Sequence, residues 1–204
     1  LMMTIERDAS GNPGAIISPL GQRTALTLDA NGHLASITNP ANETVQFGYT
    51  NDGLMTSMTD AKGSVYRYTY DPAGRLVRND DPAGGYKTYV RTDYTDGFQV
   101  TLTTAEGRRT KYEVRSVTTG GTRMTNTDEA GLSTVTLDDQ NGKTITTSPD
   151  GTVTTVLNGP DPRYGMQSPL STVTVRTPGG LQTAVEQHRI ITQMSGTIVT
   201  GMVD

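Results

Sequence analysis

The 204-residue sequence contains no cysteine and no tryptophan, and only 2 of its residues are phenylalanine. Without cysteine the chain forms no disulfide framework and no thiolate zinc site. Hydrophobic residues make up 33% of the chain, which is thin for a compact core with helices packed around it. No apolar run approaches the roughly 18 to 20 residues that a membrane-spanning helix needs, so we expect no membrane insertion by this segment.

The charge balance excludes another class of partner. The formal net charge is -4, so the chain lacks a basic footprint and we expect it to bind no nucleic acid. The sequence opens with Leu1 and shows no signal-peptide pattern. We therefore expect a piece of a longer polypeptide whose localisation signals lie outside these residues.

What the sequence does contain is glycine at a fixed spacing. One series recurs every 21 residues and consists of Gly11, Gly32, Gly53 and Gly74. A second series follows it by ten residues and consists of Gly21, Asn42, Gly63 and Gly84. Glycine and asparagine tolerate a positive φ, so both series predict turns. The second turn reads NPAN, DAKG and DPAG in successive copies, which is typical turn chemistry.

Between these turns, side chains alternate with a period of two, which predicts strands with one buried and one solvated face. Successive copies read TALTL, TVQFGY and SVYRYTY, at residues 24–28, 44–49 and 64–70. We expect equivalent residues to stack in columns, such as Leu26, Phe47 and Tyr68, or Leu28, Tyr49 and Tyr70. Each 21-residue unit is then one β-hairpin, and neighbouring hairpins must stack to bury these columns as a packed core.

The predicted fold is all-β, a curved, solenoid-like sheet of repetitive antiparallel β-hairpins. Regular repeats occupy residues 1–94, and degenerate repeats continue the sheet over residues 95–204. The proline-bearing stretch 159–169 predicts a longer loop within the second part. Residues 181–194 are predicted to be strand, although their propensity also allows a short helix.

The units YTNDGLMTSMTDAKG (49–63) and YDPAGRLVRNDDPAGG (70–85) resemble the YD repeat of the RHS family. That family includes bacterial polymorphic toxins, the cocoon-forming subunits of insecticidal toxin complexes, and animal teneurins. The resemblance is strongest over residues 28–90 and looser through 91–180. It implies that the chain is a segment of a hollow β-shell that encloses a C-terminal toxin polypeptide.

What the resemblance implies for function is structural and non-catalytic. The partners would be the flanking repeats of the same parent chain and the enclosed C-terminal toxin domain. The location would be outside a bacterium, either secreted or on the cell surface. An excised strip also ends in exposed sheet edges, so we expect edge-to-edge self-association of such a fragment.

The family's self-cleaving motif, of the type DPxGxxD, is incomplete in this sequence. The stretches DPAGRLVRND (71–80) and DPAGGYKTYV (81–90) share only its opening DPxG. The two histidines, His33 and His188, have no local spacing that supports a metal site. We therefore predict no enzyme activity, no catalytic, cofactor-binding or metal-binding residues, and no cofactor.

Acidic and amide residues near the turns raise the question of calcium. They stand two to three residues before the first glycine series, as Asp8, Asp29, Asn51 and Asp71. One carboxylate for every 21 residues is far fewer than a calcium-binding β-roll supplies. We therefore expect these side chains to bond their own backbone in Asx-turns.

Tyrosines gather in the middle of the chain, and sugar sites favour aromatic platforms with polar neighbours. The candidate residues for contact with a glycan or an enclosed cargo are Tyr66, Tyr68, Tyr86, Tyr89 and Tyr94. An alternative function is therefore an extracellular carbohydrate- or protein-binding adhesion module built on YD repeats. Because one column accepts Leu26, Phe47 and Tyr68 interchangeably, burial explains at least part of the cluster, and the sequence leaves both roles open.

Overall fold

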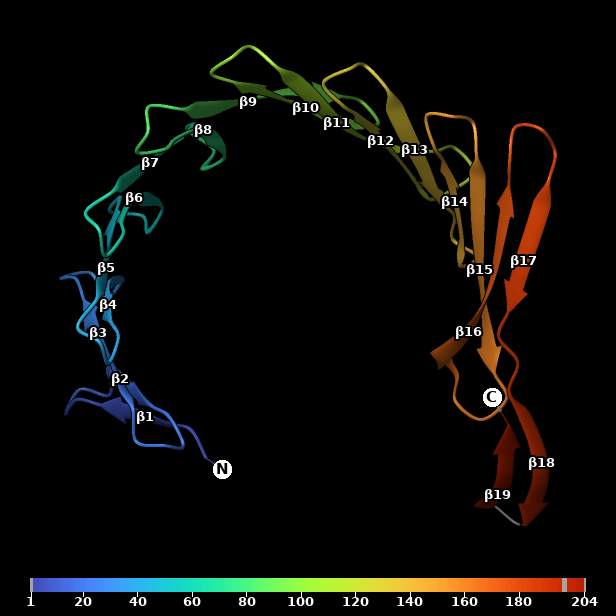
Figure 1. Ribbon diagram of the computed structural model, residues 1–204, viewed down its shortest axis with the longest axis horizontal. Coiled ribbons are helices and arrows are strands. Elements are labelled where there is room, and N and C mark those ends of the chain that lie inside the picture. The colour runs from blue at the N-terminus through green and yellow to red at the C-terminus, as the bar shows by residue number, and fades with distance from the viewer. Residues whose placement is uncertain (1, 196–197, 204) are drawn as a thin grey trace. The chain divides into compact units, whose positions relative to one another are not determined.

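The computed structural model describes residues 2–195 and 198–203, and every regular element in these ranges is a β-strand (Figure 1). The predicted all-β class of antiparallel hairpins is confirmed. Residues 1, 196–197 and 204, which belong to the two predicted repeat regions, lie outside the described residues. No helix that could span a membrane occurs in the described part of the chain.

The strands follow one another with short connections. The first nine are β1 (Thr4–Arg7), β2 (Pro13–Ile17), β3 (Arg23–Leu28), β4 (Leu34–Thr38), β5 (Thr44–Tyr49), β6 (Met55–Thr59), β7 (Val65–Tyr70), β8 (Leu76–Asp80) and β9 (Tyr86–Tyr94). The next five are β10 (Gly97–Thr104), β11 (Arg109–Ser116), β12 (Thr122–Thr127), β13 (Ser133–Asp138) and β14 (Lys143–Thr147). The last five are β15 (Val153–Asp161), β16 (Gly165–Arg176), β17 (Gln182–Glu186), β18 (Ile190–Ser195) and β19 (Ile198–Val203).

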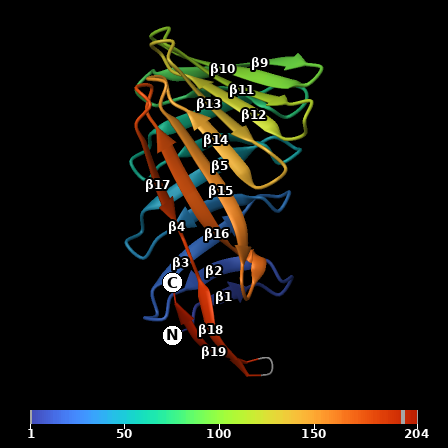
Figure 2. The ribbon, with the colours of Figure 1, turned by 90° about the vertical axis from the view of Figure 1, so that its right-hand side faces the viewer.

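The chain divides into two compact units. The first unit comprises residues 1–89 and 103–107, and the second comprises residues 90–102 and 108–204. In the first unit each strand from β1 to β8 pairs antiparallel with the strand that follows it. In the second unit the same sequential pairing runs from β11 to β17, and β18 pairs with β19 in a separate sheet. Figure 2 shows β13 to β17 of the second unit as neighbouring strands.

One turn geometry connects the hairpins throughout the first unit. In the turn after β3, the Asp29 N–H donates to the His33 carbonyl (2.8 Å) and the Gly32 N–H donates to the Asp29 carbonyl (3.1 Å). The glycine lies at φ 86°, which is the left-handed position that closes a three-residue hairpin loop. All eight positions of the two predicted series have positive φ, including Asn42 at 62°. The turns predicted from the repeat are therefore confirmed.

The lateral register corrects the predicted columns. Leu26 lies opposite Ile37, and Ile37 lies opposite Val45, which is 19 residues after Leu26 (45 minus 26). Phe47 is the equivalent of Leu26 in the next copy, and it stands two residues beyond Val45, the residue in register with Leu26. Equivalent residues therefore step diagonally across the sheet. The register shifts at a bulge where Thr27 pairs with Ser36 but Leu28 pairs with Leu34. The same shift recurs between β5 and β6 and between β7 and β8.

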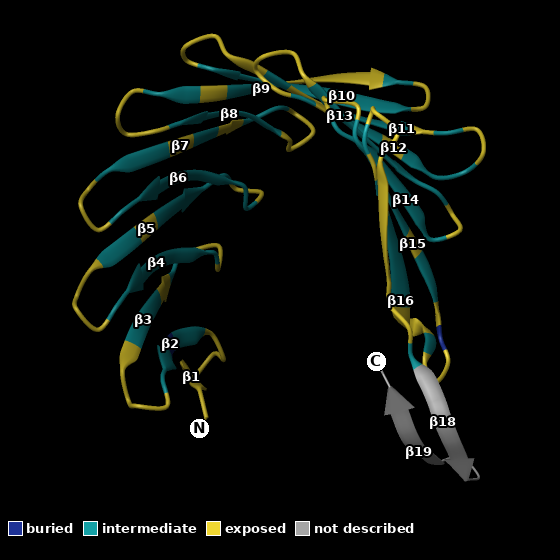
Figure 3. Ribbon diagram, turned by 45° about the vertical axis from the view of Figure 1, so that its right-hand side comes forward, coloured by how far each residue is buried: buried dark blue, intermediate teal, exposed yellow. Residues whose placement is uncertain are grey.

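The expected packed core is absent from the described residues. Within each unit the hairpins form a single layer, and most strand residues are only half-buried while the turns are exposed (Figure 3). Ala15 is the one hydrophobic residue classed as buried in the described part, and no large side chain there is fully buried. The prediction of a packed core was wrong because, within the described residues of each unit, no second layer of strands or helices packs on the sheet. Side chains instead shield one another along the face of each sheet.

The structure also corrects the prediction of a long loop at 159–169. Most of this stretch belongs to β15 and β16, and only residues 162–164 form the turn between them. In this ladder Gly159 pairs with Leu170, and the register then shifts so that Asp161 pairs with Gly165. Pro160 and Pro169 are therefore not paired residues, which allows both prolines within the strands. The strand prediction for 181–194 is confirmed, with a break at 187–189 between β17 and β18. The division into regular and degenerate repeats stays a prediction.

Candidate functional surface

The first unit carries one apolar face, which we define by the rows that register and alternation place together. One row joins Phe47, Met58 and Tyr66 across three strands. A parallel row near the turns contains the pairs Leu28–Leu34, Tyr49–Met55 and Tyr70–Leu76. The opposite face carries small and polar residues such as Thr27, Ser36 and Gln46. Cross-strand contacts within the apolar rows stabilise each hairpin against its neighbours.

Three of the five candidate tyrosines lie on this apolar face. Tyr66 and Tyr68 are two residues apart on β7, and Tyr68 lies opposite Asn79. The Tyr89 hydroxyl donates to Asn79 Oδ1 at 3.2 Å, which places Tyr89 on the same face. All three rings are half-buried. The three rings come from neighbouring strands and contribute to this face, and they do not form one exposed platform.

Tyr86 lies on the other face of the same unit. Asp80 pairs with both Arg67 and Tyr86, so Tyr86 shares their face and not that of Tyr66. The Arg78 guanidinium stacks over the Tyr86 ring, 4.0 Å from its centroid, and also bonds Asp80 at 2.6 Å. The hydrogen bond with Asp80 is the main cause that raises the pKa of Arg78 and lowers that of Asp80. This ring is held by an ion pair and has little freedom to stack on a ligand.

Tyr94 belongs to the second unit. Its hydroxyl accepts a hydrogen bond from Gln99 Nε2 at 3.1 Å. The Arg115 guanidinium lies 3.5 Å from its ring centroid and pairs with Asp96. The five candidate tyrosines therefore occupy three different environments, and contact with a glycan or cargo stays a prediction for each.

The side chain that opens each turn caps the backbone of that turn. Asp71 Oδ1 accepts hydrogen bonds from the N–H groups of Ala73 (3.0 Å) and Arg75 (2.9 Å). Asn39 does the same for Ala41 and Glu43, and Ser18 for Leu20 and Gln22. The bond from the backbone N–H four residues on is the largest cause that lowers the pKa of Asp8, Asp60 and Asp71.

These bonds agree with the Asx-turn interpretation of the acidic turns. Asp8, Asp29 and Asp71 cap as predicted, whereas the capping position of the third copy belongs to Thr50 and not to Asn51. No group of three metal-ligating side chains occurs among the described residues. One oxygen of Asp71 and one of Asp81 are committed to the turn.

The two histidines sit in unrelated settings. His33 Nδ1 lies 3.2 Å from Asp29 Oδ2, and its ring centroid lies 5.1 Å from that of Tyr49 in the next hairpin. His33 thus joins one hairpin to its neighbour within the first unit. His188, in the second unit, is largely exposed and its Nε2 lies 3.1 Å from Glu186.

Sequence reasoning missed the one buried charged side chain of the described residues, Asp161. Its Oδ1 accepts from the N–H groups of Arg163 (2.6 Å) and Tyr164 (2.7 Å), and its Oδ2 accepts from the Arg189 guanidinium (2.6 Å). Burial raises the pKa of Asp161, but these hydrogen bonds outweigh it and the net shift is downward. The carboxylate thereby fixes the β15–β16 turn and ties residue 189 to it.

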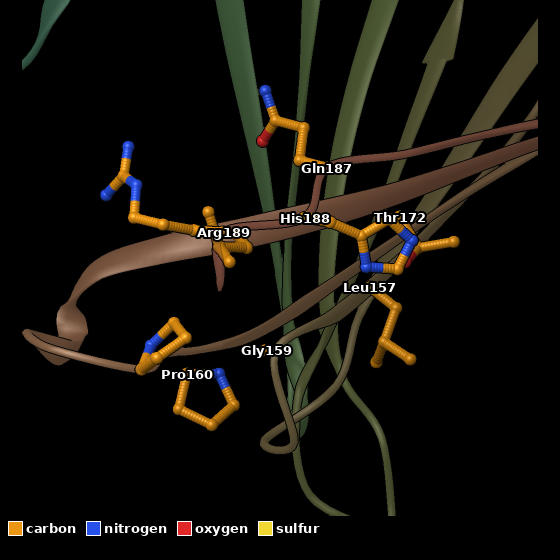
Figure 4. A pocket seen from close by; sticks show the side chains of 9 residues that line it. Leu157, Gly159, Pro160, Thr172, Gln187, His188 and Arg189 are labelled. Atoms are coloured by element: carbon orange, nitrogen blue, oxygen red, sulfur yellow. The ribbon is translucent and has the colours of Figure 1, made fainter. Parts of the chain in front are cut away.

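A hollow of about 300 Å³ adjoins this ion pair in the second unit. Figure 4 shows Arg189 and His188 projecting in different directions from one short segment, with Pro160 and Leu157 also lining the hollow. Its residues come from β15, β16, the turn between them and the break after β17. Arg189 is the only arginine, lysine or carboxylate in its lining, and Arg189 forms an ion pair with Asp161. The lining therefore contains no carboxylate that could act as a general acid or base.

Comparison with protein-family models finds a match to one family. The model of the teneurin YD-shell family matches residues 1–195. Comparison with curated proteins found no match. Among solved structures, a mutant of the Tc holotoxin pore of Photorhabdus luminescens matches with 9% identity and a TM-score of 0.38. That match covers 87% of this chain and 14% of the other, so this chain spans about a seventh of that one's length.

Proposed function

This chain belongs to the teneurin YD-shell family, and from that premise we propose that it forms part of a shell wall that encloses and carries an attached effector polypeptide. Its partners are further repeats of the parent chain and the enclosed effector, a toxin domain in the bacterial members that the repeats resemble. The role is mechanical and steric rather than catalytic. The assembly works outside the bacterium, either secreted or on the cell surface.

The observation that carries the proposal is the uncovered, laterally bonded sheet of each unit. In the first unit, consecutive strands pair through a repeated turn, and within the described residues of that unit no second layer of strands packs on the sheet. A compact enzyme domain buries its sheet against another layer to make a core. A single layer whose hairpins each contact only their neighbours is suited to a wall, because it can extend by adding repeats.

The division of the apolar and polar faces supports a wall with two different sides. Half-buried rows such as Phe47, Met58 and Tyr66 lie on one side, and hydrogen-bonded pairs such as Thr38 with Thr44 (2.8 Å) lie on the other. Two faces of different polarity suit two different surroundings. The proposal does not depend on which of them meets the effector.

The test is protease protection in the parent polypeptide. The polypeptide that carries residues 1–204 is purified intact, and digestion of its downstream domain is followed by mass spectrometry against the same domain produced alone. We expect the domain to survive at least tenfold longer inside the parent chain. Equal digestion rates, or a parent polypeptide with no further repeats and no downstream domain, would show that the chain is not part of an enclosing wall.

A further inference from the structure

Two hairpin turns of the chain share one sequence pattern, Asp-Xaa-Asn-Gly, and one turn geometry. They read DANG at residues 29–32 in the first unit and DQNG at residues 139–142 in the second. Oδ1 of Asp29 accepts hydrogen bonds from the N–H groups two and four residues on, at 2.8 and 2.9 Å, and Oδ1 of Asp139 does the same at 2.8 and 3.0 Å. The closing glycines both have positive φ, 86° and 75°. The two turns therefore form a matched pair within one chain.

One hydrogen bond distinguishes the two turns. The Gly32 N–H donates to the Asp29 carbonyl at 3.1 Å. The corresponding Gly142 N–H donates no hydrogen bond within the described part of the chain. Gly142 is held through its carbonyl, which accepts from the Asn158 N–H at 3.0 Å. The turns thus differ at the glycine nitrogen and agree around it.

The nitrogen that follows an asparagine is the nucleophile of spontaneous deamidation. This nitrogen loses its proton to solvent hydroxide and bonds to the side-chain Cγ, the Cγ–Nδ2 bond breaks, and the leaving nitrogen takes a proton from water and departs as ammonia. Water then opens one of the two C–N bonds of the resulting succinimide, which yields aspartate or isoaspartate. Glycine favours this attack because it has no Cβ. A hydrogen bond donated by the attacking N–H opposes it, because that bond must be broken before the proton can leave.

We propose that Asn141 is a modification site, at which the folded chain deamidates ahead of its other Asn-Gly pairs. The chain contains three such pairs, which begin at Asn31, Asn141 and Asn158. Asn158 is half-buried, its Oδ1 accepts from the Ser171 hydroxyl at 2.7 Å, and Gly159 lies inside β15. Asn31 and Asn141 are both exposed. Of the three, the pair at 141 combines an exposed asparagine with a glycine N–H that donates no hydrogen bond to a described residue.

Deamidation at this position changes the turn between β13 and β14 in two ways. Both products add a carboxylate two residues from Asp139, whose own carboxylate caps the turn. The isoaspartate product also adds a methylene to the main chain between residues 141 and 142, and hairpin geometry depends on loop length. We therefore expect the reaction to loosen the bond between the Gly142 carbonyl and the Asn158 N–H, which adjoins the β14–β15 pairing.

Timed incubation of the full 204-residue chain at mildly alkaline pH, followed by peptide mass spectrometry, tests the site. We expect Asn141 to convert about fivefold faster than Asn31, which is the net effect of one hydrogen bond. Conversion at Asn31 or Asn158 that is as fast as at Asn141 would overturn the proposal. In urea, where both turns are unfolded, Asn31 and Asn141 should convert at similar rates. A lead that Asn141 keeps in urea would also overturn it, because local sequence and not the folded turn would then set the rate.

The double variant Ala30→Gln with Gln140→Ala gives a matched control, because it exchanges the only residue that differs between the two patterns. Circular dichroism confirms that the variant keeps its strands. The faster conversion should stay at Asn141. If it moved to Asn31, the glutamine side chain would determine the rate and the assignment to the free N–H would be wrong.

Amide hydrogen exchange tests the structural consequence by comparing the chain before and after deamidation. We expect the Asn158 N–H to exchange faster in the deamidated chain. An Asn141→Gln variant, incubated in the same way, should show no such change. Unchanged exchange at Asn158 in the deamidated chain would show that the turn tolerates the modification. This site does not rest on the shell role, and none of these results bears on protection of the effector.

Discussion

His33 reaches from its own hairpin onto the turn of the next one, so that its Nε2 lies 3.0 Å from where a β-carbon on Gly53 would stand. Leu54 makes the corresponding approach to Gly74, at 3.7 Å from its Cδ1. In these two copies the residue that follows a turn glycine therefore lies over the glycine of the next copy, whereas Gly32 has no such neighbour within 4 Å. Neighbouring turns are linked by side chains as well as by the strands between them.

The first prediction separates backbone strain from this contact. Gly53 and Gly63 have nearly the same φ, 85° and 84°, but only Gly53 has a neighbour within 4 Å. Gly63→Ala should lower the free energy of unfolding by about 1–2 kcal/mol through strain alone. Gly53→Ala should cost more, because the His33 ring must also move away from Tyr49.

Urea unfolding of the two variants measures the difference. Adding His33→Ala to each variant provides the control, since it should recover part of the loss at Gly53 and nothing at Gly63. Equal losses of unfolding free energy in Gly53→Ala and Gly63→Ala would mean that the His33 contact does not contribute to the cost at Gly53.

The second prediction concerns a glycine that is needed for space rather than for φ. A β-carbon on Gly97 would overlap the carbonyl oxygen of Val114 in the second unit, whereas one on Gly14 would meet nothing. Gly97→Ala should therefore destabilise the chain by about 3 kcal/mol, and Gly14→Ala should be close to neutral. Thermal melting followed by circular dichroism compares them, and a tolerated Gly97→Ala would show that the backbone can separate there at little cost.

The third prediction is acid sensitivity set by the turn caps. The pKa values of Asp8, Asp60 and Asp71 are lowered from the ordinary value of 3.8 by hydrogen bonds present only in the folded state. A depressed folded pKa contributes stability above pH 3.8, and this contribution is lost as the pH falls through the lower, folded value. Melting temperatures should therefore be level near neutral pH and fall steeply below about pH 4.

Asn39 supplies the control for this acid effect, because it caps its own turn without a titrating group. Asp60→Asn should retain most of the melting temperature at neutral pH and flatten the acid limb. Asp60→Ala should lower the melting temperature at every pH, since the two N–H groups lose their acceptor. An Asp60→Asn variant that is as damaged as Asp60→Ala would show that charge, and not capping geometry, holds the turn.

The fourth prediction concerns the Asp161–Arg189 ion pair. Asp161→Asn removes the charge of Asp161 from beside the Arg189 guanidinium, which is itself only 19% exposed. We expect the Arg163 and Tyr164 amides to exchange with solvent at least about tenfold faster, as the β15–β16 turn opens locally. Asp150→Asn is the matched control, because Asp150 bonds Thr152 within an exposed turn of the same sheet. Unchanged exchange at Tyr164 would show that the turn holds without the carboxylate.

The positions of the turns can be predicted from the sequence because a positive φ restricts the residue type at one place. Gly53 or Asn42 therefore marks a turn whatever surrounds it. The alternation in residues 64–70 likewise predicts which residues share a face, and Tyr66 and Tyr68 do. These signals are local, so a single strand or turn contains all the information needed.

The lateral register and the buried carboxylate depend on partners that no local pattern marks. The extra residues at the bulges, Ala35, Thr56 and Val77, are of types common in any strand. Asp161 has the same DP sequence as Asp71, but its Oδ2 accepts from Arg189, which is 28 residues later in the sequence. Tyr86 and Tyr94 likewise take their settings from Arg78 and Arg115, which no local pattern assigns to them. For this reason the sequence alone could not divide the five tyrosines among their environments.

The two-residue step between copies of the hairpin has a consequence for how such arrays can change in length. Because side chains alternate, a displacement by an even number of residues preserves the parity of every row, and a displacement by an odd number would exchange the faces. Loss or duplication of one 21-residue copy therefore leaves both faces as they were. A single inserted residue within a strand reverses the rows that follow it until the next turn absorbs the error. Repeat arrays of this kind are thus free to lengthen by whole copies, while a single inserted residue is accommodated only in a turn or at a bulge such as those at Ala35, Thr56 and Val77.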